Sequence, residues 1–190
     1  MRALALAAAL AVCSLGGTAE AHPRGAHKKV LVTLEAGRVA LLVALDLDGG
    51  EQARLLRAGA DLDRDGRITG PEVSGLKARL VRVAREHLQI TLAGSALQAP
   101  EGEVRFSLRQ DPSVSATGIS VAVLAEVPVP GQVRPGMELV IRDRAPDGSD
   151  VDVEVDQAGA TAQESVRQAF TVAEGRDARV RAGRLRASPR

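Results

Sequence analysis

One short segment of the sequence carries acidic residues at a spacing suited to binding a metal ion. Residues 61–72 read DLDRDGRITGPE, with carboxylates at the first, third, fifth and last positions. Alternate residues of a coiling loop can converge on one point, and carboxylate oxygens are the ligands that hard cations prefer in proteins. Gly66 permits the sharp turn that such a loop needs, since it has no Cβ. We therefore predict a divalent-cation site in this segment.

The order of these residues resembles the calcium loop of the EF-hand family, in which D-x-D-x-D-G is followed by five residues and a glutamate. The resemblance covers residues 49–88, because helical spacing is expected on both sides of the loop. It implies that the apolar Ile68 anchors the loop to a partner strand or to the core. It also implies six calcium ligands, namely Asp61, Asp63, Asp65, the backbone carbonyl of Arg67, Thr69 directly or through a water, and Glu72 with both carboxylate oxygens.

Two features depart from the family's usual pattern. Ala60 precedes the loop, where the family commonly has an aromatic residue. EF-hands usually work in pairs, but residues 46–50 lack the loop spacing and the closing glutamate, and residues 143–156 fit a hairpin better. We therefore expect Ile68 to pair either with the protein's own sheet or with another copy of the chain.

The segments that flank the loop have the periodicity of helices. Ala53, Leu56 and Ala60 lie three and four residues apart, on one side of a first helix, and Arg54 and Arg57 are expected to face away. A second helix follows the loop, and its basic side is interpreted as a solvated face. Its apolar positions are Val73, Leu76, Leu80, Ala84 and Leu88.

Alternating apolar residues predict strands before and after this helical pair. Residues 28–46 are expected to form a hairpin that turns at Ala36-Gly37, and Asp147-Gly148 is a second hairpin-turn signal. Further strands are expected at about 88–92, 104–108, 119–127, 139–141, 151–155 and 166–172. Short strands at this spacing favour a sandwich or barrel. The predicted fold is α+β, an antiparallel β-sandwich-like sheet with an inserted helix–calcium loop–helix.

The N-terminus has the pattern of a secretory signal peptide. A positive start, an apolar run over residues 3–12 and the small-x-small sequence Ala19-Glu20-Ala21 predict cleavage after Ala21. An alternative interpretation treats Leu10 to Cys13 as a lipoprotein cleavage box that leaves Cys13 acylated. Val12 is bulky for that position, which argues against it. The protein is therefore expected to be periplasmic or secreted, with no transmembrane segment in the mature chain.

Length and composition fit a single mature domain over residues 22–175. Six arginines among Ala, Gly and Pro over residues 176–190 predict a disordered tail. A net charge of +1 and only two aromatic residues, Phe106 and Phe170, argue against nucleic-acid binding. The three histidines and the absence of a nucleophile elbow predict that the protein is not an enzyme.

These observations together predict an exported calcium-binding protein with one EF-hand. Extracellular calcium modules bind with dissociation constants of about 10⁻⁴–10⁻³ M, and a site that is always filled stabilises the fold. We therefore expect the ion to act mainly as a structural clamp for a binding or interaction module, rather than as a switch. The expected partners are calcium and, through the unpaired EF-hand, another protein or a second copy of the chain.

The mature N-terminus suggests an alternative. After cleavage His22 would be the first residue, so its amine and imidazole could chelate a transition metal, with His27 nearby in sequence. The order of His22-Pro23, hairpin, single EF-hand and further strands resembles exported bacterial proteins, including periplasmic portions attached to nickel/cobalt-type transporters. That resemblance implies a periplasmic accessory protein that handles nickel, cobalt or copper.

Overall fold

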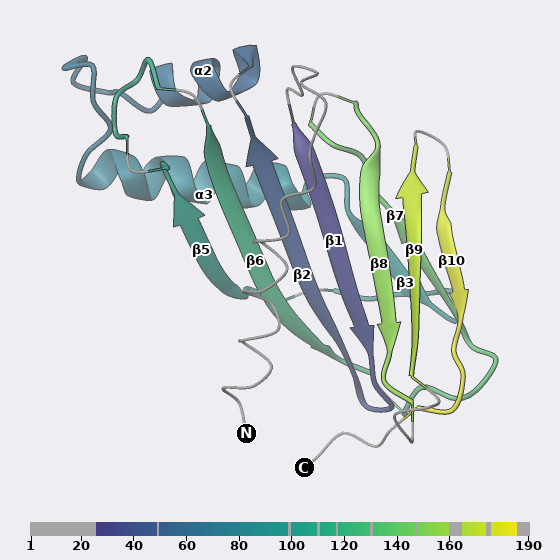
Figure 1. The fold of residues 1–190 in the computed structure, drawn as a ribbon. Helices are drawn as coiled ribbons and strands as arrows, with labels where there is room; N and C mark the ends of the chain where they lie inside the picture. Colours follow the sequence, from purple (N-terminus) through teal and green to yellow (C-terminus); the bar gives the residue numbers. More distant parts are fainter. Residues whose placement is uncertain are drawn as a thin grey trace.

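The fold combines two β-sheets with two helices (Figure 1). A computed structural model provides the coordinates. It describes residues 26–48, 50–98, 100–109, 111–116, 118–129, 131–146, 148–159, 165–173 and 176–185. The arrangement of these residues confirms the α+β class. Within them, no helix is both long enough and apolar enough to cross a membrane.

The larger sheet has six strands in the order β5-β6-β2-β1-β8-β9. Their bounds are β1 (His27–Leu34), β2 (Arg38–Leu47), β5 (Glu103–Ser107), β6 (Ile119–Pro128), β8 (Val151–Gln157) and β9 (Val166–Val172). The predicted first hairpin is confirmed, since β1 and β2 pair antiparallel with Val30 opposite Val43. The expectation of a wholly antiparallel sheet is wrong, because β1 and β8 run parallel.

The smaller sheet has four strands in the order β10-β7-β3-β4. Their bounds are β3 (Gln89–Leu92), β4 (Ser95–Ala96), β7 (Glu138–Arg142) and β10 (Ala178–Arg181). The hairpin predicted at residues 147–148 is not formed, because β7 and β8 belong to different sheets. Pairing is instead set by burial of the alternate valines of β8, which are 0% exposed beside β1.

Strand β10 lies inside the Arg-rich segment that was expected to be a disordered tail, so that expectation is wrong for residues 178–181. Ala178 and Val180 are buried while Arg179 and Arg181 are exposed, which is the alternation of a half-buried strand. The many arginines of this segment led to the prediction of disorder, although the alternation of apolar and charged residues is that of a strand. Residues 186–190 lie outside the described part of the chain.

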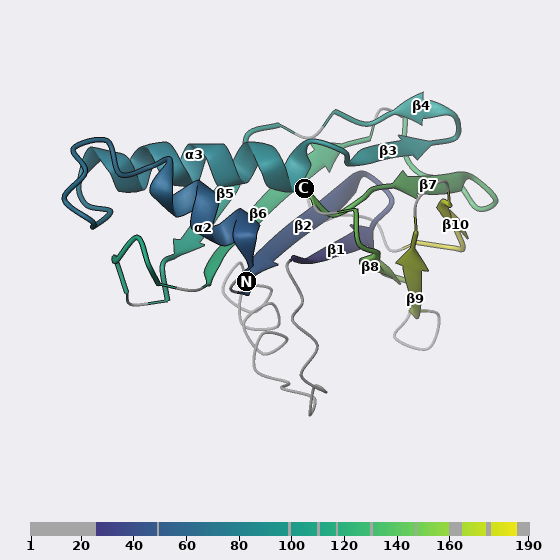
Figure 2. The ribbon, with the colours of Figure 1, turned by 90° about the horizontal axis from the view of Figure 1, so that it is seen from above.

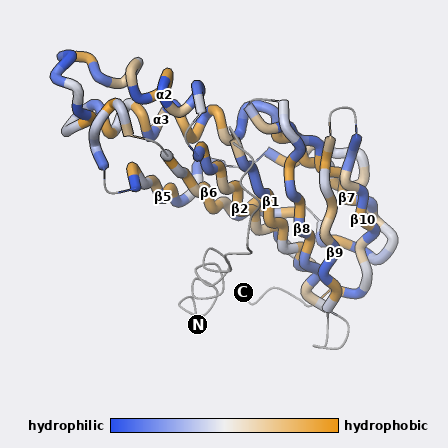
Figure 3. The backbone as a smooth tube through the Cα atoms, turned by 45° about the horizontal axis from the view of Figure 1, so that its top comes forward, coloured by the Kyte–Doolittle hydropathy of each residue, from blue (hydrophilic) through white to orange (hydrophobic). Residues whose placement is uncertain are grey.

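One face of the larger sheet carries most of the core. Figure 2 shows helix α3 (Pro71–Arg85) and the smaller sheet on the same side of the larger sheet. Helix α2 (Glu51–Ala58) precedes α3 and connects directly to β2. Figure 3 shows that the loop joining α2 and α3 is mostly hydrophilic, whereas hydrophobic and hydrophilic residues are mixed along the strands. The residues of α3 that are buried here are Glu72, Leu76, Leu80 and Ala84.

Candidate metal centre

The segment with the predicted ligands joins two helices, as the sequence indicates. Helix α2 ends at Ala58, and α3 begins at Pro71, where a missing N–H costs no helical hydrogen bond. Gly66 has a φ of 81°, a left-handed conformation in which a side chain would be strained. The predicted role of Gly66 in the sharp turn is therefore matched by its backbone conformation.

Three of the predicted ligands lie close together in this loop. Asp61, Asp63 and Asp65 each offer a carboxylate oxygen, and these oxygens lie within 4.8 Å of one another. Like charges at this separation repel, and a bound cation would remove the repulsion. The Oδ1 atom of Asp61 is buried and has no hydrogen-bond partner. Burial of an unpaired carboxylate oxygen is unfavourable, so the donor set fits a hard cation that would satisfy this atom.

The other oxygens of the same carboxylates shape the loop. Oδ2 of Asp61 accepts the backbone N–H of Gly66 at 3.1 Å, so the first residue of the loop is tied to its turn. Oδ1 of Asp63 accepts the N–H of Asp65 at 3.1 Å, and Oδ1 of Asp65 accepts the N–H of Arg67 at 2.7 Å. These bonds hold the three carboxylates against the backbone of the loop.

Glu72 is buried, but it does not belong to the group of three carboxylates. Its Oε2 accepts the N–H of Thr69 at 3.1 Å, and its Oε1 accepts the N–H groups of Leu62 at 2.6 Å and Asp63 at 3.4 Å. These hydrogen bonds, first of all that from Thr69, lower the pKa of the Glu72 carboxyl below its ordinary value. Glu72 thus ties the end of the loop to its beginning. Calcium ligation by Glu72 stays a prediction, as it does for the exposed residues Arg67 and Thr69.

Ile68 pairs with the chain's own residues. It is 1% exposed, and its N–H donates to the carbonyl oxygen of Pro112 at 2.8 Å. The N–H of Val114 donates in return to the carbonyl oxygen of Gly66 at 3.0 Å. This short antiparallel bridge lies outside the named strands, in the connection between β5 and β6.

Arg57 was expected to face away from the core, and that expectation is wrong. The residue is 0% exposed, and burial lowers the pKa of its guanidinium, which nevertheless remains charged. The helical spacing carried a signal for this position, because Arg57 lies four residues after the buried Ala53. The guanidinium donates to the carbonyl oxygens of Leu108 at 3.1 Å, Asp111 at 2.9 Å, Ser113 at 2.8 Å and Gly118 at 2.7 Å.

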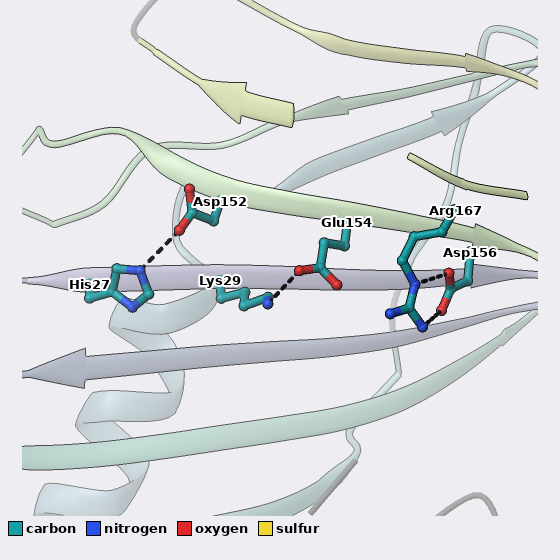
Figure 4. A network of polar contacts seen from close by, with 6 residues as sticks. All are labelled: His27, Lys29, Asp152, Glu154, Asp156 and Arg167. Carbon is teal, nitrogen blue, oxygen red and sulfur yellow. Dashed lines mark hydrogen bonds and ion pairs between the residues drawn. The ribbon is translucent and has the colours of Figure 1, made fainter. Parts of the chain in front are cut away.

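The second predicted metal site, made of two histidines, is only partly described. His22 lies outside the described residues. His27 is exposed at the start of β1, and its Nε2 lies 3.0 Å from the carboxylate of Asp152 on the outer side of β8 (Figure 4). The same side of β8 carries two further ion pairs, Lys29 with Glu154 at 2.5 Å and Arg167 with Asp156 at 2.7 Å.

Comparison with models of known protein families gives no match, and comparison with curated proteins finds no matching relative. The chemistry of this centre is therefore argued from its own residues, their distances and their burial.

Proposed function

We propose that this protein is an exported calcium-binding protein with a single EF-hand, in which the ion acts mainly as a structural clamp for a binding or interaction module. The observation that carries the proposal is the buried, unpaired Oδ1 of Asp61 beside the carboxylates of Asp63 and Asp65. A cation at this place would supply the missing partner and neutralise the repulsion.

The donor chemistry supports calcium over other metals. The clustered donors are carboxylate oxygens, which suit hard cations, whereas nickel, copper and zinc favour imidazole or thiolate ligands. Calcium takes six to eight oxygens in flexible geometry, while magnesium demands a near-ideal octahedron at about 2.0–2.1 Å. A loop of twelve residues that supplies side-chain and backbone oxygens suits the flexible coordination of calcium better than the octahedron of magnesium.

The position of the loop supports a clamp. The loop connects α2 to α3, it pairs with the β5–β6 connection through Ile68, and α3 packs on β2 and β6. An ion at Asp61 would therefore hold together segments that are far apart in the sequence. In a compartment where calcium stays well above the dissociation constant, such a site would be permanently filled.

Titration calorimetry of the purified protein tests calcium binding. We expect one calcium ion per chain with a dissociation constant of about 10⁻⁴–10⁻³ M, and weaker binding of magnesium. Asp61→Asn should weaken calcium binding by at least about tenfold, since it removes a ligand charge. Asp156→Asn is the matched control, because Asp156 lies on the outer side of β8 beside Arg167. Absence of calcium binding at millimolar concentration, or equal binding by the Asp61 and Asp156 variants, would overturn the proposal.

The proposed export has its own test. Expression of the full chain with its N-terminus intact should yield an extracytoplasmic product that begins at His22, as measured by intact mass. A product that retains residues 1–21 in the cytoplasm contradicts export, and an acylated product that begins at Cys13 supports the lipoprotein alternative.

A further inference from the structure

The connection between β5 and β6, described at residues 108–109, 111–116 and 118, pairs directly with the loop that joins α2 and α3. We infer that this connection is the pairing partner of the calcium loop, in the place that a second EF-hand would take, and that Arg57 is the positioning residue that holds it there. The inference rests on the proposed function, since it concerns what calcium binding does to the rest of the chain.

The bridge between the two segments already occupies the pairing groups of the loop. The N–H of Ile68 and the carbonyl of Gly66 are the groups through which the loop pairs, and both are engaged by Pro112 and Val114. Ser113 lies opposite Arg67 in antiparallel register. A second copy of the chain could pair at this position only by displacing residues 112–114. The loop is therefore completed within one chain.

The side chain of Arg57 holds the connection in place through hydrogen bonds to its backbone. The connection turns several backbone carbonyls inward, and Arg57 satisfies four of them from one side chain. A guanidinium offers five N–H donors in a fixed planar fork, whereas a lysine offers three donors from a single point. Loss of Arg57 would leave the buried carbonyl of Gly118 and three partly buried carbonyls without this donor, and an unpaired buried carbonyl is more costly than the loss of a bond alone.

The connection is also anchored to β2. The guanidinium of Arg109 contacts the carboxylate of Asp46 at 2.5 and 2.6 Å and that of Asp48 at 2.6 Å. Gly118 has a φ of 87°, and a Cβ there would come within 2.8 Å of Cδ of Arg109. The positive φ favours glycine here, and the Arg109 side chain lies against Gly118, so the two ends of the connection lie side by side near the end of β2.

These contacts make a continuous path from the ion to the larger sheet. Calcium would fix the backbone around Gly66 and Ile68, and the bridge to Val114 would therefore stay closed. The connection would in turn hold β5 against β6. Coupling of this kind is reciprocal, so a loosened connection must weaken calcium binding by the same factor by which calcium tightens it.

Hydrogen exchange measured by NMR on the full chain tests the inference without any substitution. With calcium present, the amides of Ile68 and Val114 should exchange at least about tenfold more slowly than in metal-free buffer, because calcium stabilises the closed bridge. The amide of Gly136, which donates to Ala182 at 2.7 Å in a distant loop, is the internal control and should not respond. Calcium binding that leaves Val114 unchanged overturns the inference while the proposed function stands. If the protein does not bind calcium at all, the proposed function itself fails.

Substitution of Arg57 tests its positioning role. Arg57→Gln should raise the calcium dissociation constant about fivefold or more, because a loosened connection is coupled to calcium binding, and Arg57→Lys should restore part of the affinity. Arg54→Gln is the matched control, because Arg54 lies one turn earlier on the same helix, is exposed and pairs only with Glu51. Equal affinities for the Arg57 and Arg54 variants overturn the assignment.

Two further measurements complete the test. The first uses a second variant, in case the Arg57 variant does not fold, and the second tests whether two chains pair. Val114→Pro removes the N–H that donates to the carbonyl oxygen of Gly66, and it also replaces a partly buried side chain, so the variant should bind calcium more weakly than a Ser115→Ala control. Sedimentation of the calcium-loaded wild-type protein should show a monomer. A dimer that forms only with calcium would identify a second copy as the pairing partner and overturn the inference.

Discussion

The ammonium group of Lys28 lies 2.6 Å from Oδ1 of Asp143, and neither side chain is exposed to solvent. Oδ1 also accepts the N–H of Arg144 at 2.8 Å, while Oδ2 is buried without a hydrogen-bond partner. Lys28 belongs to β1 of the larger sheet and Asp143 follows β7 of the smaller one, so the pair ties the two sheets together. Burial raises the pKa of the Asp143 carboxyl and lowers that of the Lys28 ammonium, although each partner opposes the shift of the other.

Lys28→Met should lower the free energy of unfolding by about 3–5 kcal/mol, because it leaves a buried carboxylate without its cation. Lys29→Met is the matched control. Lys29 is the next residue on the same strand, points to the other face and makes a partly exposed pair with Glu154, so its loss should cost no more than about 1 kcal/mol. Urea denaturation followed by circular dichroism measures both, since the chain has no Trp or Tyr for fluorescence.

The double variant Lys28→Met/Asp143→Leu completes this test. Replacement of a whole buried ion pair by apolar residues is often neutral or stabilising, so the double variant should recover most of the stability that Lys28→Met loses. Equal losses for the Lys28 and Lys29 single variants would contradict the burial of the pair.

Calcium should raise the melting temperature of the protein. At about 100 times the dissociation constant, binding adds roughly 2.7 kcal/mol to the free energy of unfolding. For a chain of this size, that corresponds to an increase of about 5–10 °C. Thermal melting with calcium and with a chelator measures the shift, which Asp61→Asn should reduce by about half or more and Asp156→Asn should retain. A shift of the same size in the Asp61 variant would place the ion elsewhere.

The hydrogen bonds to Glu72 predict a dependence of stability on pH. Because the pKa of Glu72 is lowered in the folded protein, its contribution is present above the ordinary value of 4.5 and is lost as the pH falls through the folded value. In metal-free buffer, the free energy of unfolding of the wild type should therefore fall more steeply below pH 4.5 than that of Glu72→Gln. Glu101→Gln, at an exposed position, should follow the wild type. Parallel curves for the wild type and the Glu72 variant would show that these hydrogen bonds do not favour the ionised carboxyl.

The features predicted correctly from the sequence are those that neighbouring residues determine. Alternation gives the hairpin of β1 and β2, and spacings of three and four give α2 and α3. The order of carboxylates around Gly66 predicts a loop in which Asp61, Asp63 and Asp65 converge. Each of these features depends on contacts between residues that lie close together in the sequence.

The missed features depend on segments that meet only after folding. Lys28 and Asp143 are 115 residues apart, and the partners of Arg57 lie 51–61 residues away. Alternation places Lys28 on the same side of β1 as Val30, but the neighbouring sequence does not indicate which acidic residue pairs with it. For the same reason, the turn signal at residues 147–148 could not reveal that β8 pairs in parallel with β1.

Leu80→Ala should destabilise the protein by about 2–5 kcal/mol, because Leu80 is fully buried on the side of α3 that packs on the larger sheet. Leu62→Ala is the control for the same chemical change, since Leu62 is 78% exposed in the loop that joins α2 and α3 and should change the stability by less than about 0.5 kcal/mol. Urea denaturation in metal-free buffer separates this packing effect from calcium binding. If both leucine variants lose equal stability, α3 is not docked on the sheet through Leu80. The sheet then could not fix the end of the calcium loop, and the ion would stabilise an isolated pair of helices rather than the whole domain.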